Sequence, residues 1–307
     1  MARAHPIARG IAVLSFIVVV FFAAAFLLTI GSDGDLASAL AFGDKVGVVE
    51  VKGVISESDA VVESLKEFER SPAVKAVVVR VESPGGGVAP SQEIYAAILK
   101  LRAVKPVVAS FGGVAASGGY YIAAACDTIV ANPGTITGSI GVIMELGNLE
   151  GLLDKVGVVP QTIKSGAHKD MGSPTRPLTQ KERRLFQEMI DSVHTQFVDA
   201  VASGRDMDAA RVRELADGRI YSGEQAHAAG LVDALGGLDD AIAMAAERGG
   251  IEGEPRVRHM RSREFPWWWG MLFDLAPGSL ARGLAQGLGN SPPVSGLQLL
   301  YGGPLLR

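Results

Sequence analysis

The chain has 307 residues, of which 48% are hydrophobic and 20% are charged, and its net charge at pH 7 is −4. This length accommodates a membrane anchor and a domain with a full hydrophobic core, and the composition is typical of a globular protein rather than a disordered one. Because basic residues are not in surplus, we expect no binding to nucleic acid. The single cysteine, Cys126, excludes an intramolecular disulfide framework.

An uncharged apolar stretch occupies residues 10–30. At about 1.5 Å of rise per residue, a helix of this length spans roughly 30 Å, the thickness of a bilayer core. Two arginines precede the stretch and two aspartates follow it, so the positive-inside rule places residues 1–9 in the cytoplasm. We therefore expect a single-pass anchor in a bacterial inner (cytoplasmic) membrane, with a periplasmic or otherwise extracytoplasmic domain. A cleaved signal peptide is the alternative, since small residues at 37–39 permit cleavage.

After a linker at 31–44, apolar β-branched runs alternate with helical stretches. We expect buried strands at 45–55, 74–83, 106–113, 127–132 and 158–165. The expected helices are 58–70, 90–102, 117–125, 179–203, 208–216, 222–229 and 237–248. Thr179 with Glu182 and Ser222 with Gln225 form capping-box patterns. Valine-rich strands alternating with helices predict an α/β domain whose parallel sheet is covered on both faces.

Ser117 lies where an apolar strand runs through glycines and small residues into an apolar helix, in ASFGGVAASGGYY (109–121). A serine at the start of a helix is next to free N–H groups that can stabilise an oxyanion. The absence of bulky neighbours lets a substrate backbone come close. Tight packing of the helix on the sheet is the alternative explanation for the same small residues.

A second glycine-rich stretch, ESPGGGVAPSQEI (82–94), follows another buried strand. Amides of Gly85, Gly86 or Gly87 could face a substrate carbonyl there. Neither this loop nor the one before Ser117 has the glycine and lysine pattern of a nucleotide-binding loop.

The polar stretch 163–179 supplies the candidates for a general base to serve Ser117. A histidine base would be His168, and a lysine base would be Lys164 or Lys169. A lysine base must be neutral, which burial without a carboxylate partner favours. Sequence spacing does not choose among these three residues, and a solvated loop is the alternative reading of the stretch.

Four motifs give the chain a resemblance to a known family: 82–87, 116–143, 164–179 and 218–237. Over about residues 45–250 the sequence resembles the short form of the signal peptide peptidase A family, serine proteases of the ClpP/crotonase superfamily. The resemblance implies a ClpP/crotonase-like fold of stacked β-β-α units with a helical C-terminal part, here preceded by one transmembrane helix.

The resemblance also implies site residues. The serine of ASGGYY, Ser117, corresponds to the family nucleophile, and the second lysine of KSG-x-x-KD, Lys169, to its general base. Ser139 of TGSIGV corresponds to the serine that supports the lysine amine. Backbone amides at Gly86 and Gly118 correspond to the oxyanion hole. Neither a metal nor an organic cofactor is implied.

The family resemblance further implies partners. Short members assemble into rings, with eight subunits expected, and neighbouring subunits contribute the serine and the lysine. Substrates would be cleaved signal peptides and other apolar peptides at the membrane. A membrane-protein quality-control protease, a crotonase-type acyl-CoA enzyme and a non-catalytic membrane scaffold are the alternatives.

The tail at 251–307 differs in composition from the rest and contains Trp267, Trp268 and Trp269. Three consecutive tryptophans suit a membrane interface, and a subunit contact explains them equally well. The terminal apolar segment could fold back toward a substrate groove.

Overall fold

A computed structural model describes residues 43–260 and 298–300. The predicted anchor at 10–30 and the tryptophans at 267–269 lie outside the described residues. Among the helices that are described, none is long and apolar enough to cross a bilayer. The chain divides into residues 1–44 and a compact unit that begins at Lys45, and the fold described below belongs to this second unit.

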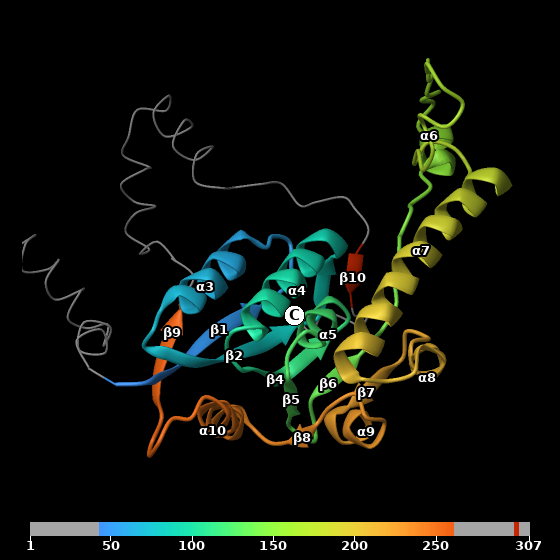
Figure 1. Cartoon of the computed structure of the whole chain (residues 1–307). Coiled ribbons are helices and arrows are strands. Elements are labelled where there is room, and N and C mark those ends of the chain that lie inside the picture. The colour runs from blue at the N-terminus through green and yellow to red at the C-terminus, as the bar shows by residue number, and fades with distance from the viewer. Residues whose placement is uncertain (1–42, 261–297, 301–307) are drawn as a thin grey trace, which may run out of the picture. The chain divides into compact units, whose positions relative to one another are not determined.

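The centre of the unit is a mostly parallel sheet with the order β7-β6-β4-β2-β1-β9, in which β5 also pairs with β4, and β8 pairs with β5 (Figure 1). Only the β6–β7 pair of this sheet is antiparallel among its described pairings. The strands are β1 (Lys45–Lys52), β2 (Val74–Ser83), β4 (Val107–Ala116), β5 (Thr128–Ala131), β6 (Ile136–Gly138), β7 (Ile220–Ser222), β8 (Ala234–Leu235) and β9 (Arg256–Met260).

Helices cover both faces of the sheet. On one face lie α3 (Asp59–Arg70), α4 (Val88–Arg102) and α5 (Gly118–Ala123), and on the other lies α10 (Leu238–Arg248). The remaining described helices are α6 (Glu150–Lys155), α7 (Gln180–Arg205), α8 (Ala209–Leu215) and α9 (Gly223–Ala228). The C-terminal part of α7 packs into the same core as α5.

Strand β2 has an almost continuous apolar sequence because both of its faces are buried. Val77 and Val79 are fully buried in the core beneath α3, α4 and α5, while Ala76 and Val78 are fully buried against α10. Each buried valine contributes about 1.5–3 kcal/mol relative to an exposed one, so neither face can carry polar side chains.

Strand β4 changes its pairing partner in its middle and shifts its register with β2, and Ser117 follows its end. Its first half pairs with β5 and its second half with β6. At the division, the Gly113 N–H donates to both carboxylate oxygens of Glu82, at 2.9 and 3.0 Å. A β-carbon on Gly112 would lie 1.5 Å from Glu82 Oε2, so the Glu82 carboxylate keeps this position only next to glycine.

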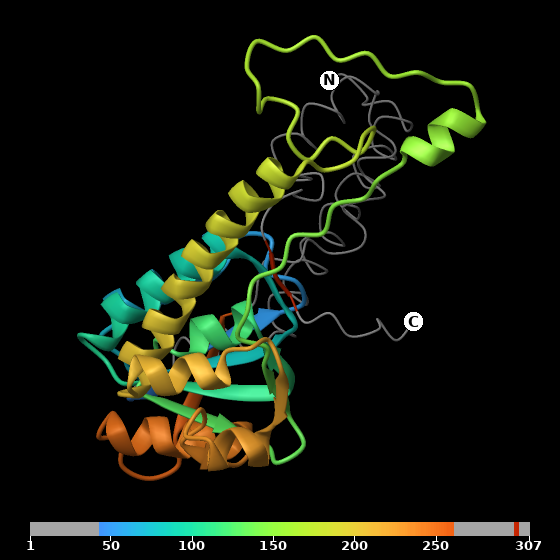
Figure 2. The same ribbon diagram turned by 90° about the vertical axis from the view of Figure 1, so that its right-hand side faces the viewer.

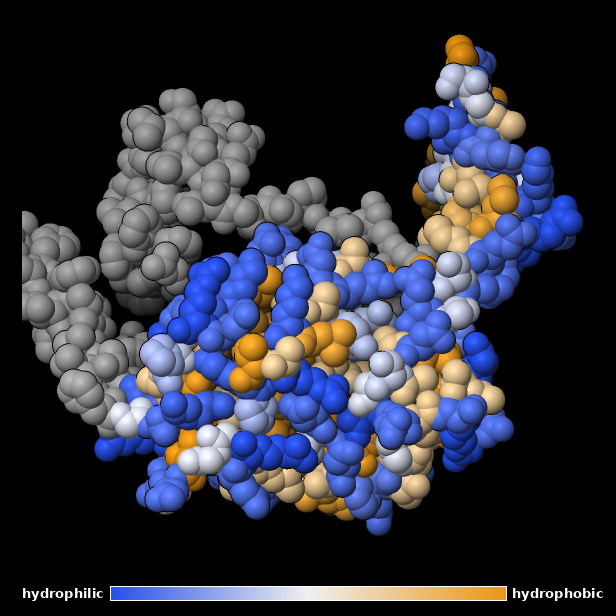
Figure 3. Space-filling model, viewed as in Figure 1, coloured by the Kyte–Doolittle hydropathy of each residue, from blue (hydrophilic) through white to orange (hydrophobic). Residues whose placement is uncertain are grey.

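Residues 141–179 leave the sheet and run beside the N-terminal half of α7 (Figure 2). Apolar residues are exposed along this segment, which is hereafter called the arm, and Figure 3 shows orange patches on it. They are Ile143, Leu146, Leu149, Leu152, Val156, Val158, Val159 and Ile163.

The prediction of a buried strand at 158–165 is wrong. These residues form no strand and are all exposed, and Val159 is 79% exposed. A β-branched sequence forms a strand only where a neighbouring strand pairs with it, and none does within the described part of the arm.

The α/β class with a largely parallel sheet is confirmed, and both capping boxes are present. The finer assignment to a stack of β-β-α units stays a prediction. The four-residue strand β5 lies within the strand predicted at 127–132, but other short strands, such as β6 and β9, were not predicted because short runs carry too little periodicity.

Candidate active site

Ser117 occupies a strained junction between β4 and α5. Its backbone has φ 52° and ψ −115°, a combination that non-glycine residues rarely adopt and that costs about 1–3 kcal/mol. Two hydrogen bonds hold it there: its N–H donates to Gly138 O at 2.8 Å, and its carbonyl accepts from Tyr121 N at 2.8 Å. The side chain is fully buried, and its hydroxyl has no hydrogen-bond partner among the described residues. A serine hydroxyl kept in this state is free to react with a group that enters the site.

Strand β3 (Gly85–Gly87) brings a second backbone segment to Ser117. Ile55 N donates to Gly85 O at 2.9 Å, and Gly87 N donates to Ile55 O at 2.7 Å. Because successive residues of a strand direct their polar groups to opposite sides, the N–H of Gly86 points away from Ile55. A β-carbon on Gly86 would lie 2.2 Å from Ile55 O, so the strand can come this close only with glycine.

Gly118 completes the pair of amides. A β-carbon built on Gly118 would lie 3.2 Å from Gly86 N and 2.6 Å from Ser91 Oγ. As the first residue of α5, Gly118 has an N–H with no acceptor inside the helix. Gly86 N thus lies close to Gly118, the residue directly after Ser117 in the chain, and these two glycines carry the two amides that the sequence predicted for an oxyanion-binding site.

Ser139 is tied to the same junction. It directly follows Gly138, the acceptor of the Ser117 N–H, and β6 aligns Gly138 with Ala116 of β4. Ser139 also has a positive φ of 51° and is 7% exposed, and its own N–H donates to Arg219 O at 2.8 Å. Two buried serines with left-handed backbones therefore lie on paired strand ends.

Strand β10 (Gln298–Leu300) pairs with β3 in antiparallel orientation, with Leu299 aligned to Gly86. An extended segment of the chain's own terminal part therefore lies along the strand that carries the Gly86 amide (Figure 1). This pairing shows that the free edge of β3 accepts an extended peptide backbone.

Lys169 is not brought into contact with Ser117 within one chain, since the Ser117 hydroxyl is unpartnered. It lies on the arm in a turn that its N–H closes by donating to Gly166 O at 3.2 Å, and its side chain is exposed. The other candidate bases differ from it. Lys164 is paired with Asp170 at 2.5 Å, whereas His168 is exposed on the same turn.

The described residues contain no group of three or more His, Cys, Asp and Glu side chains arranged to hold a metal ion. The buried Cys126 lies in the core behind α5, where burial raises the pKa of its thiol far above the usual range. A thiol in this state is a packing group and not a nucleophile.

Comparison with known proteins decides the family. The profile of Peptidase family S49 matches residues 100–252. A Synechocystis protein provisionally named a protease is 48% identical over 210 residues, which cover 68% of this chain and 76% of the relative. The chain belongs to peptidase family S49. The predicted resemblance to signal peptide peptidases is thereby confirmed, and the protein is a peptidase.

Two further relatives agree with this assignment. An Enterococcus faecium protein provisionally named signal peptide peptidase SppA is 48% identical over 179 residues, or 58% of this chain and 52% of the relative. The chloroplastic serine protease SPPA of Arabidopsis thaliana is 37% identical over 211 residues, or 66% of this chain and 31% of the relative.

Several residues that build the S49 site were not singled out from the sequence. Ile55 anchors β3 through two backbone hydrogen bonds, and Ser91 Oγ donates to Gly87 O at 2.9 Å. Ile55 gave no signal because its role is carried by its backbone. Ser91 lies within the glycine-rich stretch 82–94, so its position at the start of a helix was visible there.

Proposed function

We propose that this S49 peptidase is a serine endopeptidase in which Ser117 is the nucleophile and Lys169 is the general base. The observation that carries the proposal is the strained, buried Ser117 hydroxyl without a partner, beside the amides of Gly86 and Gly118. Backbone strain of this kind is concentrated at functional sites.

The reaction follows from these groups. The neutral amine of Lys169 takes the proton of the Ser117 hydroxyl as the oxygen attacks a peptide carbonyl. The amides of Gly86 and Gly118 hold the oxyanion of the tetrahedral intermediate. The protonated lysine then returns the proton to the leaving amine, which breaks the peptide bond, and water hydrolyses the acyl-enzyme. Ser139 supports the lysine amine by hydrogen bonding.

Lys169 reaches Ser117 from a neighbouring subunit of a homo-oligomeric ring, for which eight subunits are expected. Two features of the arm support this arrangement: Lys169 is exposed there, and apolar residues elsewhere on the arm, such as Leu152 and Val159, are exposed as well. Contact with a second subunit removes this apolar surface from water. Desolvation in that contact also favours the neutral form of a lysine amine.

The substrates are apolar peptides, including cleaved signal peptides, that bind in extended form along β3. Pairing of β10 with β3 supports this mode of binding. The name of the Enterococcus relative supports signal peptides as the class. Residues 10–30 anchor the protein in the cytoplasmic membrane of a bacterium, with the peptidase domain outside the cytoplasm, and clearance of other membrane peptides belongs to the same activity.

The acyl-enzyme provides the test. The full chain in detergent is mixed with an activated ester of a short apolar peptide, quenched in acid within the first turnover, and analysed by mass spectrometry after digestion. The acyl group is expected on Ser117 and is absent in Ser117→Ala. An acyl group on another residue, or turnover by Ser117→Ala at the wild-type rate, contradicts the proposal.

A further inference from the structure

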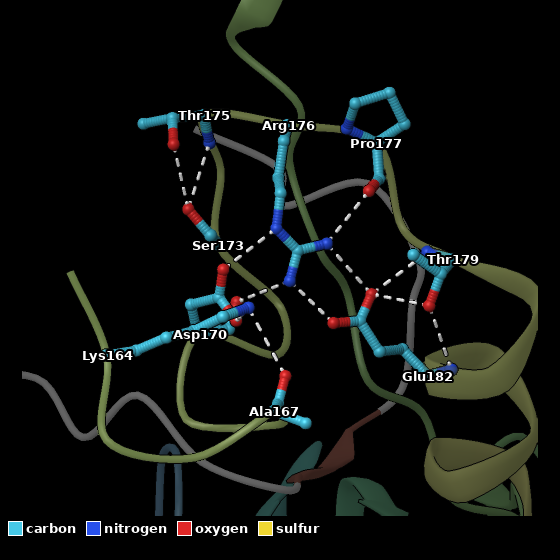
Figure 4. A network of polar contacts seen from close by, with 9 residues as sticks. All are labelled: Lys164, Ala167, Asp170, Ser173, Thr175, Arg176, Pro177, Thr179 and Glu182. Atoms are coloured by element: carbon cyan, nitrogen blue, oxygen red, sulfur yellow. Dashed lines mark hydrogen bonds and ion pairs between the residues drawn. The ribbon is translucent and has the colours of Figure 1, made fainter. Parts of the chain in front are cut away.

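Arg176 connects the turn that carries Lys169 to the long helix α7 (Figure 4). Its Nε donates to Asp170 Oδ2 at 3.0 Å and its Nη2 to the Asp170 carbonyl at 3.1 Å. Its Nη1 and Nη2 donate to the two carboxylate oxygens of Glu182 at 2.9 and 2.5 Å, and Nη1 also donates to Pro177 O at 3.1 Å. All five N–H donors of the guanidinium are therefore used, in a geometry that lysine cannot reproduce.

Glu182 fixes one side of this connection to a rigid element. Its side chain is 3% exposed, and besides Arg176 it accepts from Thr179 N and Thr179 Oγ1, both at 2.9 Å. The Thr179 hydroxyl in turn accepts from Glu182 N at 3.2 Å, completing the capping box of α7. The guanidinium is thus bound to the first turn of a helix whose other end lies in the core.

Asp170 fixes the other side, directly after Lys169 in the chain. One of its carboxylate oxygens accepts from Arg176, and the other accepts from Lys164 Nζ at 2.5 Å. Lys164 Nζ also donates to Ala167 O at 3.2 Å. The Asp170 carboxylate therefore holds the turn at 166–170 between Lys164 on one side and Arg176 on the other. The exposed Lys169 side chain has no partner among the described residues.

Most exposed ion pairs contribute only about 0–1 kcal/mol, so pairing alone does not make a functional device. This network differs in two respects: Glu182 is buried, and Arg176 is held by both a carboxylate fork and backbone carbonyls. Such a clamp fixes the orientation of the Lys169 turn relative to α7, because the planar guanidinium binds both carboxylates in a defined geometry.

We propose that Arg176, through Asp170 and Glu182, is a positioning residue that sets where the arm presents the amine of Lys169. The proposal rests on the proposed function of Lys169 as the general base. Since a displacement of about 1 Å at a catalytic group costs about 100-fold in rate, loss of the clamp lowers kcat while peptide binding along β3, and hence KM, stays nearly unchanged.

The test compares Arg176→Met, Arg176→Lys and Asp170→Asn in the full chain, with kcat, KM, oligomer size and thermal midpoint measured for each. Arg211→Met is the matched control, because it removes an exposed pair with Glu214 far along the chain on α8. We expect kcat to fall about 100-fold in both Arg176 variants with unchanged KM and assembly. Asp170→Asn keeps the shape of the side chain and is also expected to lower kcat. It provides the test if Arg176→Met fails to fold.

Two results overturn the proposal: full kcat in Arg176→Met, or a fall in kcat that follows loss of assembly or of thermal stability in all three variants. A double variant separates positioning from other effects. In a Lys169→Ala background, Arg176→Met is expected to cause no further loss, because the group that it positions is absent. If Lys169→Ala itself retains full activity, the proposed function fails, whereas an inactive Lys169→Ala with a fully active Arg176→Met removes the positioning role alone.

Discussion

The backbone nitrogen of Gly86 lies 3.2 Å from the point that a β-carbon on Gly118 would occupy. Two segments separated by the whole of α4 thus come within contact distance immediately beside Ser117. Glycine at 118 leaves room for both Gly86 and the Ser91 hydroxyl, which would lie 2.6 Å from the same β-carbon. A β-carbon at this position therefore pushes the Gly86 amide back by a few tenths of an ångström and turns the Ser91 hydroxyl aside.

Gly118→Ala is therefore expected to reduce kcat by about 100-fold to 1,000-fold, the loss typical of a displaced oxyanion donor. Overpacking against Ser91 adds a cost of about 1–3 kcal/mol in unfolding free energy. Steady-state kinetics and urea unfolding measure the two effects. Gly134→Ala is the control, since a β-carbon on that exposed glycine meets no atom within 4 Å, and it is expected to keep wild-type activity. Equal activities in the two variants would contradict the assignment of the amides.

The proposed supply of Lys169 by a neighbouring subunit predicts complementation between two inactive variants. When Ser117→Ala and Lys169→Ala chains are co-expressed in equal amounts, a head-to-tail ring with random order restores about a quarter of the sites. Peptide hydrolysis by the mixed oligomer measures this recovery, and each variant expressed alone serves as the control. A mixture as inactive as its components would place both groups in one chain.

Strand β10 occupies the edge of β3 where an extended substrate is proposed to bind, so it competes with substrate. A chain that ends after residue 297 is expected to show a lower KM for an apolar peptide with little change in kcat. A chain that ends after residue 300 retains β10 and is the matched control. If both shortened chains have the same KM, β10 does not compete at this edge.

Arg176 also makes the connection between the Lys169 turn and α7 sensitive to acid. Hydrogen bonds from Arg176 hold the pKa of Glu182 at about 2 and the pKa of Asp170 well below its usual range. Because these pKa values are depressed in the folded protein, the stabilisation is present above the ordinary carboxyl pKa of about 4 and is lost as pH falls toward 2.

Protection of residues 170–185 against hydrogen exchange, corrected for the intrinsic effect of pH, reports this stabilisation. Arg176→Met is expected to reduce protection at pH 7, and its difference from wild type shrinks as pH falls below about 4. Arg211→Met, with its exposed partner Glu214, leaves protection of this segment unchanged. A difference that persists undiminished at pH 2 would show that the carboxylate charges are not responsible.

The sequence predicted the local features of this peptidase well and its long-range ones poorly. Ser117, Gly118 and the glycines at 85–87 were identified because strand-to-helix junctions of small residues are visible in a short window. The register shift of β4 beside Glu82 was not predicted, since it depends on contacts between residues about thirty positions apart. On the arm, by contrast, the sequence predicted an element that is not there. The valines at 158 and 159 predicted a buried strand, but no partner strand lies beside them among the described residues.

Sequence spacing also left open which of Lys164, His168 and Lys169 is the general base. The contacts of the arm distinguish the two lysines, because Lys164 is committed to Asp170 while the Lys169 side chain has no partner among the described residues. A general base needs an amine that is free to approach the serine hydroxyl, and the Lys164 amine is held by Asp170 instead.

The most direct test of the central claim measures kcat for an apolar signal-sequence peptide in Ser117→Ala, Lys169→Ala, Lys164→Ala and His168→Ala, each as the full chain with oligomer size checked. Activity is expected to be lost in Ser117→Ala and in Lys169→Ala, with unchanged assembly. His168→Ala is expected to stay close to wild type, and Lys164→Ala to keep part of its activity because Arg176 still holds Asp170. Full activity in Lys169→Ala together with an inactive His168→Ala would contradict the account and make His168 the base.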